Sequence, residues 1–381
     1  MRIAVPGNVK FVLDTLCGAG FEAYIVGGCV RDCLLGLPAG DYDVCTSAQP
    51  DEVIRLFKKT AATGIKHGTV TVIEDSTPIE VTTFRTDGDY SDSRRPDTVE
   101  FTNNLKADLS RRDFTVNAMC YSESAGLIDY FDGLGDLKKK TLRTVGDADR
   151  RFGEDALRIL RLFRFCSTLD FTAESHTFDA AVKNAYLLKR ISAERIEKEL
   201  RKTACGKNPS AILPLIDSGI LPTLSANRDI SKIPLLPEKE NLRFFAFLYL
   251  QSDDLPKLLD YLRCSNAFKK YAADLSSNMN TKAESREDIK RLLSTLEENV
   301  FDLFALKTVF SGENTANAAA TAKEITESKE PYKISQLAIN GKDIAARGYK
   351  GAQISKVLCG LLERVIAEPE LNKKETLENL I

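Results

Sequence analysis

The spacing of apolar residues divides the chain into a front part with mixed patterns and a long helical remainder. Before about residue 145, strand-like stretches with apolar residues at every second position alternate with helix-like ones. Residues 69–75 (TVTVIED) and 78–85 (PIEVTTFR) flank a short polar turn and predict a β-hairpin. The glycine-containing stretch 125–136 (AGLIDYFDGLGD) predicts a hinge or domain boundary.

Beyond this point apolar residues recur at helical spacing and strand patterns nearly vanish. The predicted helical segments cover residues 153–169, 192–204, 240–251, 286–310 and 333–348, the last as a helix, a turn and another helix. The pattern therefore predicts an N-terminal α/β domain followed by a helical half. Residues 85–98 (RTDGDYSDSRRPDT) contain few large apolar side chains and predict a mobile loop.

A strand-like run, YIV, leads into Gly27 and Gly28, and a pair of acids, Asp41 and Asp43, follows closely. Glycines after a strand let backbone N–H groups approach a phosphate chain. If the two aspartates lie on a strand, they point to the same face, because side chains alternate with a period of two. Two like charges so close favour a bound cation such as Mg²⁺, although a solvated turn also explains the pair.

A third acid, Glu80, stands between Ile79 and Val81 in the second strand of the predicted hairpin. A buried carboxylate there needs a partner or a metal, whereas an outward-facing one is ordinary. Two glycines, a DxD pair and a later acid within a strand together suit two-metal phosphoryl transfer.

Composition narrows the chemistry further. The 381 residues are 43% hydrophobic and 28% charged, and the net charge of −2 predicts no bulk attraction to nucleic acid. With only two histidines, a histidine-rich metal site is excluded, and without a CxxC pair reduced thiols are favoured over a zinc site; any metal would have oxygen ligands. Nine scattered cysteines and the lack of a long apolar stretch predict a cytoplasmic protein with reduced thiols and no membrane span.

Five motifs occur in a characteristic order. They are GGCVRDCLLGLPAGDYDV (27–44), FRTDGDYSDSRRPDTVEF (84–101), DLSRRDFTVNAM (108–119), GEDALRILRLFRF (153–165) and ISAERIEKEL (191–200). Together they resemble the class II tRNA nucleotidyltransferases, or CCA-adding enzymes, and their poly(A) polymerase relatives in the polymerase β-like superfamily. The resemblance implies an elongated molecule with an α+β head (1–145; small mixed or antiparallel sheet with helices) and an all-α neck (146–206), body (207–300) and tail (301–381).

The resemblance also implies roles for individual residues. Asp41 and Asp43 would hold Mg²⁺ as metal ligands, and Glu80 would be the third catalytic carboxylate. The implied nucleotide-binding residues are Gly28 and Arg31 for the phosphates, Arg112, Asp113 and Asn117 for the ribose and triphosphate, Asp155 and Arg158 for the base edge, and Arg161 and Arg164 beside them.

The assignment of Asp155 and Arg158 makes chemical sense. Three positions apart on a predicted helix, they would share one face, with an acceptor and a donor for the amine-bearing edges of cytosine and adenine. A site built for those hydrogen bonds rejects uracil and guanine without reading a nucleic-acid template. Arg161 and Arg164 continue the row, which is either a solvated face or, because like charges repel, a binding site for triphosphate or RNA backbone.

Two further basic features remain open. Basic residues gather near the domain boundary and form either a phosphate-binding strip or a solvated run of charges. They are Lys138, Lys139, Lys140, Arg143, Arg150 and Arg151. The resemblance implies that the loop at 85–98 is a lever that repositions between C and A addition, although a disordered connector also explains the stretch. Its presence favours competence for the terminal A; its charged residues are Arg85, Asp87, Asp92, Arg94 and Arg95.

The resemblance therefore implies addition of C, C and A to the 3′ end of tRNA from CTP and ATP with Mg²⁺. The tRNA partner would be bound by its acceptor end and elbow, largely through the helical half, and no DNA partner is expected. Alternatives within the class are an A-adding-only enzyme and a poly(A) polymerase. From other classes, a non-catalytic RNA-binding protein and a small-molecule nucleotidyltransferase remain as rivals.

Overall fold

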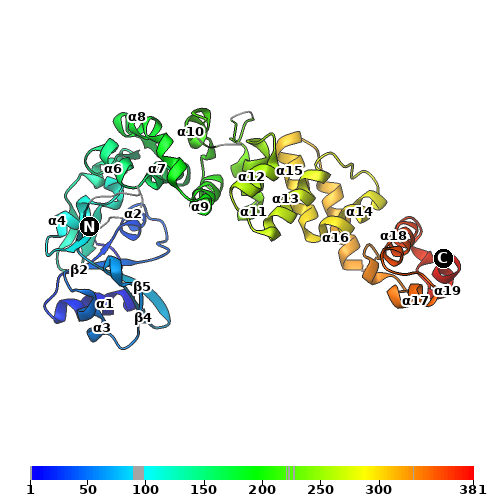
Figure 1. Ribbon diagram of the computed structural model, residues 1–381, viewed down its shortest axis with the longest axis horizontal. Helices are drawn as coiled ribbons and strands as arrows, with labels where there is room; N and C mark the ends of the chain where they lie inside the picture. The colour runs from blue at the N-terminus through cyan, green and yellow to red at the C-terminus, as the bar shows by residue number, and fades with distance from the viewer. Residues whose placement is uncertain (1, 89–97, 220, 222–223, 226–227, 329) are drawn as a thin grey trace. The chain divides into compact units, whose positions relative to one another are not determined.

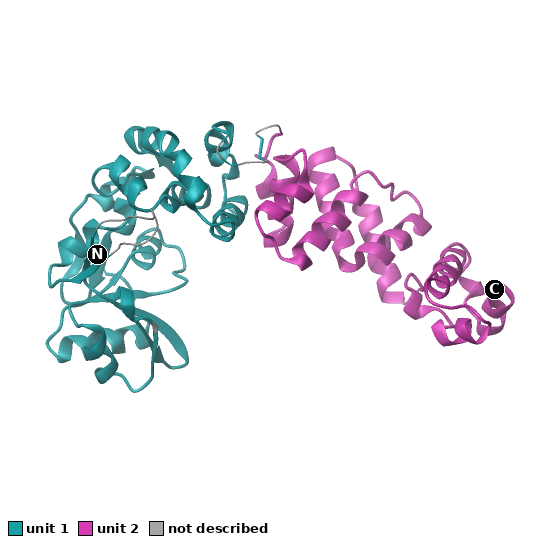
Figure 2. Ribbon diagram, viewed as in Figure 1, with its two compact units in different colours: residues 1–226 teal, residues 227–381 magenta. Residues whose placement is uncertain are grey.

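The computed structural model describes residues 2–88, 98–219, 221, 224–225, 228–328 and 330–381. The chain forms two compact units, residues 1–226 and residues 227–381 (Figure 2). The first unit contains a mixed sheet with helices, and the described part of the second is helical (Figure 1). The predicted fold class, an α+β head followed by helices, is confirmed. Within the described residues, no helix combines the length and apolar character needed to cross a membrane.

A seven-stranded sheet forms the centre of the head, in the order β3-β4-β5-β2-β1-β8-β9. The predicted hairpin is confirmed as the antiparallel pair of β4 and β5. Strand β2 pairs parallel with β5 and antiparallel with β1, which places the first strands of the chain in the middle of the sheet. The strands are β1 Ala23–Val26, β2 Asp43–Thr46, β3 Thr60–Gly64, β4 Thr69–Glu74, β5 Thr77–Thr83, β8 Met119–Ser122 and β9 Gly126–Asp129.

Burial alternates along β5, and this alternation decides where its acid points. Ile79 and Val81 are fully buried, whereas Glu80 between them is exposed. Helices α1 and α3 pack against β4, and α2 packs against β1 and β8. The head helices are α1 Gly7–Gly18, α2 Gly28–Leu34, α3 Pro50–Leu56, α4 Leu105–Ser110 and α5 Gly133–Lys138.

The prediction of a hinge at residues 125–136 is wrong. This stretch supplies β9, which pairs with β8 at one edge of the sheet, and then α5. Gly126 has a φ of +70°, which a glycine adopts readily, and it opens β9 directly after the tight turn from β8. The glycine here serves a hairpin within the head.

The continuous helix predicted over 153–169 is broken. α6 (Ala148–Glu154) ends before Asp155, whose backbone is extended with φ −137° and ψ 102°, and α7 (Leu157–Leu169) follows. The Asp155 carboxylate accepts a hydrogen bond from the N–H of Leu157 at 3.1 Å, so an aspartate side chain starts the second helix. The remaining elements of this region are β10 Thr141–Leu142, β11 Thr172–Ala173, α8 Ser175–Lys183, α9 Ala193–Ala204 and α10 Leu213–Asp217.

The second unit contains helices α11 Glu240–Leu250, α12 Leu255–Tyr261, α13 Asn266–Asn278, α14 Arg286–Leu296, α15 Val300–Leu306, α16 Ala316–Ser328, α17 Gly341–Ala346, α18 Ala352–Ala367 and α19 Lys374–Asn379. The helical pattern over 286–310 is interrupted at Glu297, which has a φ of +51°. Over 333–348, the first predicted helix is only a 3₁₀ turn, Ile334–Gln336. The end of the chain has its own core, which includes Ile344, Leu362 and Leu377.

The predicted loop at 85–98 begins and ends in a small ribbon. Strand β6 (Arg85–Asp87) pairs antiparallel with β7 (Val99–Phe101), so the two ends of the loop are held together. Three charged residues of the predicted loop lie outside the described residues, namely Asp92, Arg94 and Arg95.

Candidate active site

Asp43 and Glu80 are neighbours across the parallel pair of strands β2 and β5, with their Cα atoms in register. Both side chains are exposed, and both line a pocket of about 180 Å³. Arg85, Arg111 and Arg112 line the same pocket. The structure thus brings together two acids that are far apart in the sequence and surrounds them with basic side chains.

Asp41 takes a different place from the one predicted. Strand β2 begins at Asp43, so Asp41 precedes it, and the condition under which both aspartates would point to one face of a strand is not met. Asp41 is exposed and still acts electrostatically on Asp43. Within the described ranges, no three His, Cys, Asp or Glu side chains come together as a ready-made metal cluster.

The electrostatics of the acids fit a divalent cation. Partial removal from water, followed by the nearby Glu80 carboxylate, raises the pKa of Asp43, while Arg112 opposes the shift. Two adjacent carboxylates supply the hard oxygen ligands that Mg²⁺ prefers. Mg²⁺ commonly takes only one or two protein carboxylates and completes its coordination with water and substrate phosphates. The donor set therefore suits Mg²⁺, with Asp43 and Glu80 as the paired ligands and Asp41 nearby.

The glycine turn before α2 lets an arginine approach the acids. Gly27 has a φ of +85°, and a Cβ built on it would lie 3.2 Å from Nη1 of Arg112. Gly28 opens α2 directly afterwards, and Arg112 lies 3.6 Å from the buried carboxylate of Asp108. A side chain at position 27 would therefore be strained and would crowd a guanidinium that faces the pocket.

Four of the predicted nucleotide-binding residues form one hydrogen-bonded chain. Nη1 of Arg31 donates to Oδ1 of Asn117 at 2.6 Å, and Nδ2 of Asn117 donates to Oδ1 of Asp113 at 3.1 Å. Nε and Nη2 of Arg161 donate to Oδ2 of Asp113 at 2.8 and 2.6 Å. Arg161 and these hydrogen bonds hold the pKa of Asp113 well below its usual range despite its burial. The chain runs from α2 through the 3₁₀ turn Thr115–Asn117 to α7.

Asp155 and Arg158 do not share a helix face, because Asp155 lies at the break before α7. Oδ2 of Asp155 is 3.5 Å from Nη2 of Arg195 in α9, and burial raises the pKa of Asp155. Arg158 is buried and donates to Oε2 of Glu154 at 2.8 Å and to the carbonyl oxygen of Arg111 at 3.0 Å. The aspartate and the arginine are therefore each held by separate partners.

The argument that the row of arginines needs an external anion is wrong. Glu154, Asp113 and Glu199 each bond one member of the row: Arg158, Arg161 and Arg164 respectively. Arg158 and Arg164 are also buried, so the row is not a solvated face either. Burial, with Arg161 close by, lowers the pKa of Arg164 to about 10.

The sequence reasoning missed Glu154 and Glu199, which bond Arg158 and Arg164 of this row, and Arg195, which bonds Asp155. Glu154 stands four residues before Arg158, a spacing that predicts an ion pair on a continuous helix. In the structure the pair forms across the break between α6 and α7. Glu199 occurs three positions after Ile196 and directly before Leu200, so it falls on the apolar side of α9. A carboxylate on an apolar face indicates a buried cationic partner.

The possible phosphate-binding strip near the boundary contains three arginines that form ion pairs and three lysines for which the described residues provide none. Arg143 bonds Asp136 at 2.8 Å, and Arg150 and Arg151 both bond Glu154. The three lysines, Lys138, Lys139 and Lys140, are exposed, and so is Arg150. The arginines of this strip are therefore occupied by carboxylates of the protein.

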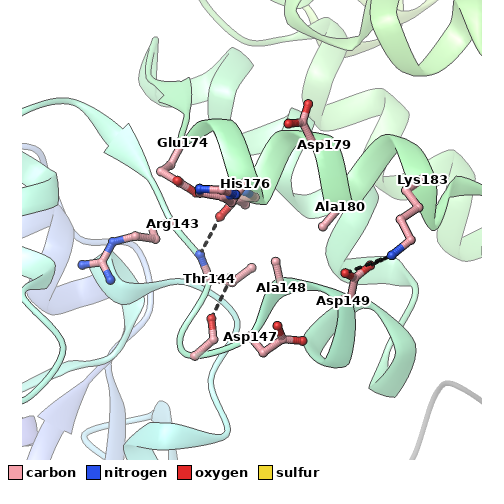
Figure 3. Close-up of a pocket in the computed structure, with 12 residues that line it drawn as sticks. Arg143, Thr144, Asp147, Ala148, Asp149, Glu174, His176, Asp179, Ala180 and Lys183 are labelled. Atoms are coloured by element: carbon pink, nitrogen blue, oxygen red, sulfur yellow. Dashed lines mark hydrogen bonds and ion pairs between the residues drawn. The ribbon is translucent and has the colours of Figure 1, made fainter.

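A larger pocket, of about 510 Å³, lies between the loop before α6 and helix α8 (Figure 3). Its lining includes Arg143, Glu174 and His176, and the ion pair between Asp149 and Lys183 stands at one side. It shares no lining residue with the pocket of Asp43 and Glu80.

Comparison with known proteins agrees with this geometry. Residues 23–143 match the poly(A) polymerase head domain family, and residues 170–225 match the family described as the probable RNA and SrmB-binding site of polymerase A. The CCA-adding enzyme of Ligilactobacillus salivarius is 37% identical over 96% of this chain and 93% of its own length. That of Lactobacillus delbrueckii is 43% identical over 77% of this chain and 74% of its own length.

Solved structures give the same result. The CCA-adding enzyme of Bacillus stearothermophilus in complex with CTP superposes with a TM-score of 0.83 at 31% identity, covering 98% of this chain and 95% of that one. The Thermotoga maritima enzyme in complex with tRNA shares the fold, with a TM-score of 0.67 at 20% identity over 100% and 99% of the two chains.

The mixed sheet with two acids across β2 and β5 is thus the head of a polymerase β-like nucleotidyltransferase. With relatives of this identity along almost its whole length, the chain belongs to the CCA-adding enzyme family.

Proposed function

We propose that this protein adds C, C and A to the 3′ end of tRNA from CTP and ATP, with release of pyrophosphate. The observation that carries the proposal is the pairing of Asp43 with Glu80 beside Arg112, within a chain of the CCA-adding enzyme family. The named complexes of its relatives with CTP, ATP and tRNA support the substrates.

Asp43 and Glu80, with Asp41 nearby, would hold Mg²⁺. When bound, the cation lowers the pKa of the attacking 3′ hydroxyl and stabilises charge on the leaving pyrophosphate. The positive charge of Arg112 beside the carboxylates favours a polyphosphate in the same pocket. Arg31, Asp113 and Asn117, already fixed by mutual hydrogen bonds, are preorganised to bind the ribose and phosphates.

Base selection is assigned to Asp155 and Arg158. Each is held by its own partner, Arg195 and Glu154 respectively, and the charge of Arg158 acts on Asp155, which supports a shared role at one base. An acceptor and a donor in fixed positions match the amine-bearing edges of cytosine and adenine. Against uracil or guanine, the hydrogen-bonding groups of the protein would be left unpaired.

The four-part division into head (1–145), neck (146–206), body (207–300) and tail (301–381) remains a prediction, as do tRNA contacts at the acceptor end and elbow. The lack of a membrane-spanning helix among described residues is consistent with the predicted cytoplasmic location.

The proposal is tested by extension of tRNA ending at the discriminator base, at C and at CC, resolved to single nucleotides. Three additions that stop at CCA support it. One A added only to CC-ended tRNA would indicate an A-adding enzyme, and a long A tail a poly(A) polymerase. Pyrophosphate release only with a small hydroxyl acceptor, or RNA binding without incorporation, would support the rivals from other classes.

A further inference from the structure

Phe165 lies among three arginine side chains of the nucleotide site. The Cζ atoms of Arg31, Arg161 and Arg164 are 4.9, 5.3 and 4.2 Å from the centroid of its ring. Arg31 comes from α2 in the head, whereas the other two stand near Phe165 in α7. One ring therefore contacts guanidinium groups from two separate parts of the first unit.

The ring itself is firmly placed. Phe165 is buried, with 7% of its surface exposed, and its plane meets that of Phe114 at 87° with the centroids 5.9 Å apart. This edge-to-face contact joins α7 to the residue that follows Asp113. A ring fixed in this way can fix the orientation of groups that lie on it.

Two of the three arginines are the ends of the hydrogen-bonded chain described above. Arg31 begins the chain and Arg161 closes it on Asp113, and both guanidinium groups also contact Phe165. Hydrogen bonds to Asn117 and Asp113 fix the edges of these guanidinium groups, while the aromatic ring contacts them from another side. The two kinds of contact together restrict each guanidinium more than either does alone.

Charge explains why an aromatic residue suits this position. The guanidinium groups of Arg31 and Arg161 repel that of Arg164, and Asp32, Asp113 and Glu199 offset part of the repulsion within this group. The negative face of an aromatic ring attracts cations further, whereas an aliphatic side chain of similar size does not.

We propose that Phe165 is a positioning residue that holds Arg31 and Arg161 in the orientation needed to bind the ribose and phosphates of the incoming nucleotide. This inference rests on the proposed function of the site. Because ribose and triphosphate are common to CTP and ATP, the loss of Phe165 weakens the binding of both nucleotides equally. Base choice, assigned to Asp155 and Arg158, stays as in the unmodified protein.

The test compares Phe165→Leu with Phe163→Leu in the full chain. Phe163 is a matched control: it lies on the same helix, is buried, and packs edge to face on Phe178 at 6.2 Å. Among described residues, no guanidinium or ammonium group lies over its ring. We expect Phe165→Leu to raise KM for CTP and ATP alike by about tenfold, with a smaller change in kcat. Phe163→Leu should lower the melting temperature comparably and leave both KM values within about twofold.

A second pair of measurements separates positioning from stability. Phe165→Tyr keeps the aromatic face and should restore KM to near that of the unmodified protein, and binding of CTP measured by equilibrium dialysis should follow the same order. Equal effects of Phe165→Leu and Phe163→Leu on KM, or unchanged CTP binding in Phe165→Leu, would overturn the proposal. Dialysis reports on Phe165 even if the unmodified protein fails to extend tRNA, so failure of the proposed function is recognised separately.

Discussion

Asp43 and Glu80 stand directly across from each other on parallel strands, and Arg112 acts on Asp43 from the same pocket. Partial removal from water and, after it, the repulsion from Glu80 raise the pKa of Asp43. Two carboxylates held this close for catalysis lower the stability of the folded chain.

Asp43→Asn should therefore raise the melting temperature at neutral pH while it abolishes nucleotide incorporation. The sign follows from the raised pKa: the folded state holds a proton that the unfolded state has already lost, so stability falls as the pH rises from about 4 through the folded-state pKa. Asp43→Asn lacks this loss of stability with rising pH. The difference in melting temperature between the variant and the unmodified protein should therefore be small in acid and grow towards neutral pH.

Thermal unfolding between about pH 4 and pH 7.5 measures this difference. Asp179→Asn is a suitable control, because Asp179 is exposed on helix α8 and lines a pocket that contains neither Asp43 nor Glu80. If the gain in melting temperature is the same at every pH, or if Asp43→Asn is less stable than the unmodified protein at every pH, then Asp43 and Glu80 do not destabilise the fold by repulsion.

Mg²⁺ should stabilise the unmodified protein and not the Asp43→Asn variant. A ligand that binds only the folded state adds about 2.7 kcal/mol at one hundred times its dissociation constant. Melting temperatures measured against Mg²⁺ concentration should rise for the unmodified protein and for Asp179→Asn. A chelator should stop incorporation with little loss of fold. Equal Mg²⁺ responses in all three proteins would place the cation elsewhere.

Arg158→Ala should loosen the choice among the four nucleotides by about tenfold or more, because a specific donor to the base edge is lost. Arg158→Lys should fail to restore it, since one ammonium cannot make the several directed bonds of a guanidinium. Arg150→Ala is the matched control: Arg150 bonds the same Glu154, but 73% of its side chain is exposed. Single-nucleotide incorporation with each NTP measures the result.

Slower incorporation by Arg158→Ala with unchanged base preference would remove Arg158 from base selection. Asp155→Ala should change base preference as well. A variant of Asp155 that only loses stability would instead indicate that its role is to begin α7 and pair with Arg195.

Asp113→Ala should lower the free energy of unfolding by about 3 kcal/mol, because it leaves Arg161 and Asn117 without their buried partner. The lowered pKa of Asp113 means that its contribution is present above about pH 4 and is lost as the pH falls. Urea unfolding at pH 7 and in acid measures both effects. A loss of stability below about 1 kcal/mol at pH 7 would show that the pair contributes little to stability.

Local patterns predicted much of the head and its chemistry. The hairpin of β4 and β5, the glycine turn before α2 and the acids Asp43 and Glu80 each follow from a short stretch of sequence. What the sequence could not show is that β2 and β5 would be parallel neighbours, because strand pairing depends on the order of the whole sheet.

In the helical region, too, contacts between distant parts of the chain could not be predicted from the sequence. Apolar periodicity runs through Asp155 without interruption, yet the backbone of Asp155 is extended and its side chain accepts a hydrogen bond from the N–H of Leu157, the first residue of α7. The row of arginines seemed to need an external anion because two of its carboxylates are distant in sequence: Asp113 is 48 residues from Arg161, and Glu199 is 35 from Arg164. Only the folded chain brings these charges together.

The most direct test of the account is extension of a tRNA that ends at the discriminator base, with CTP, ATP and Mg²⁺, by the unmodified protein and by Asp43→Asn. The account predicts three additions ending at CCA for the unmodified protein and none for the variant, with tRNA binding retained by both. Substantial extension by Asp43→Asn, or additions by the unmodified protein that do not end at CCA, would contradict it.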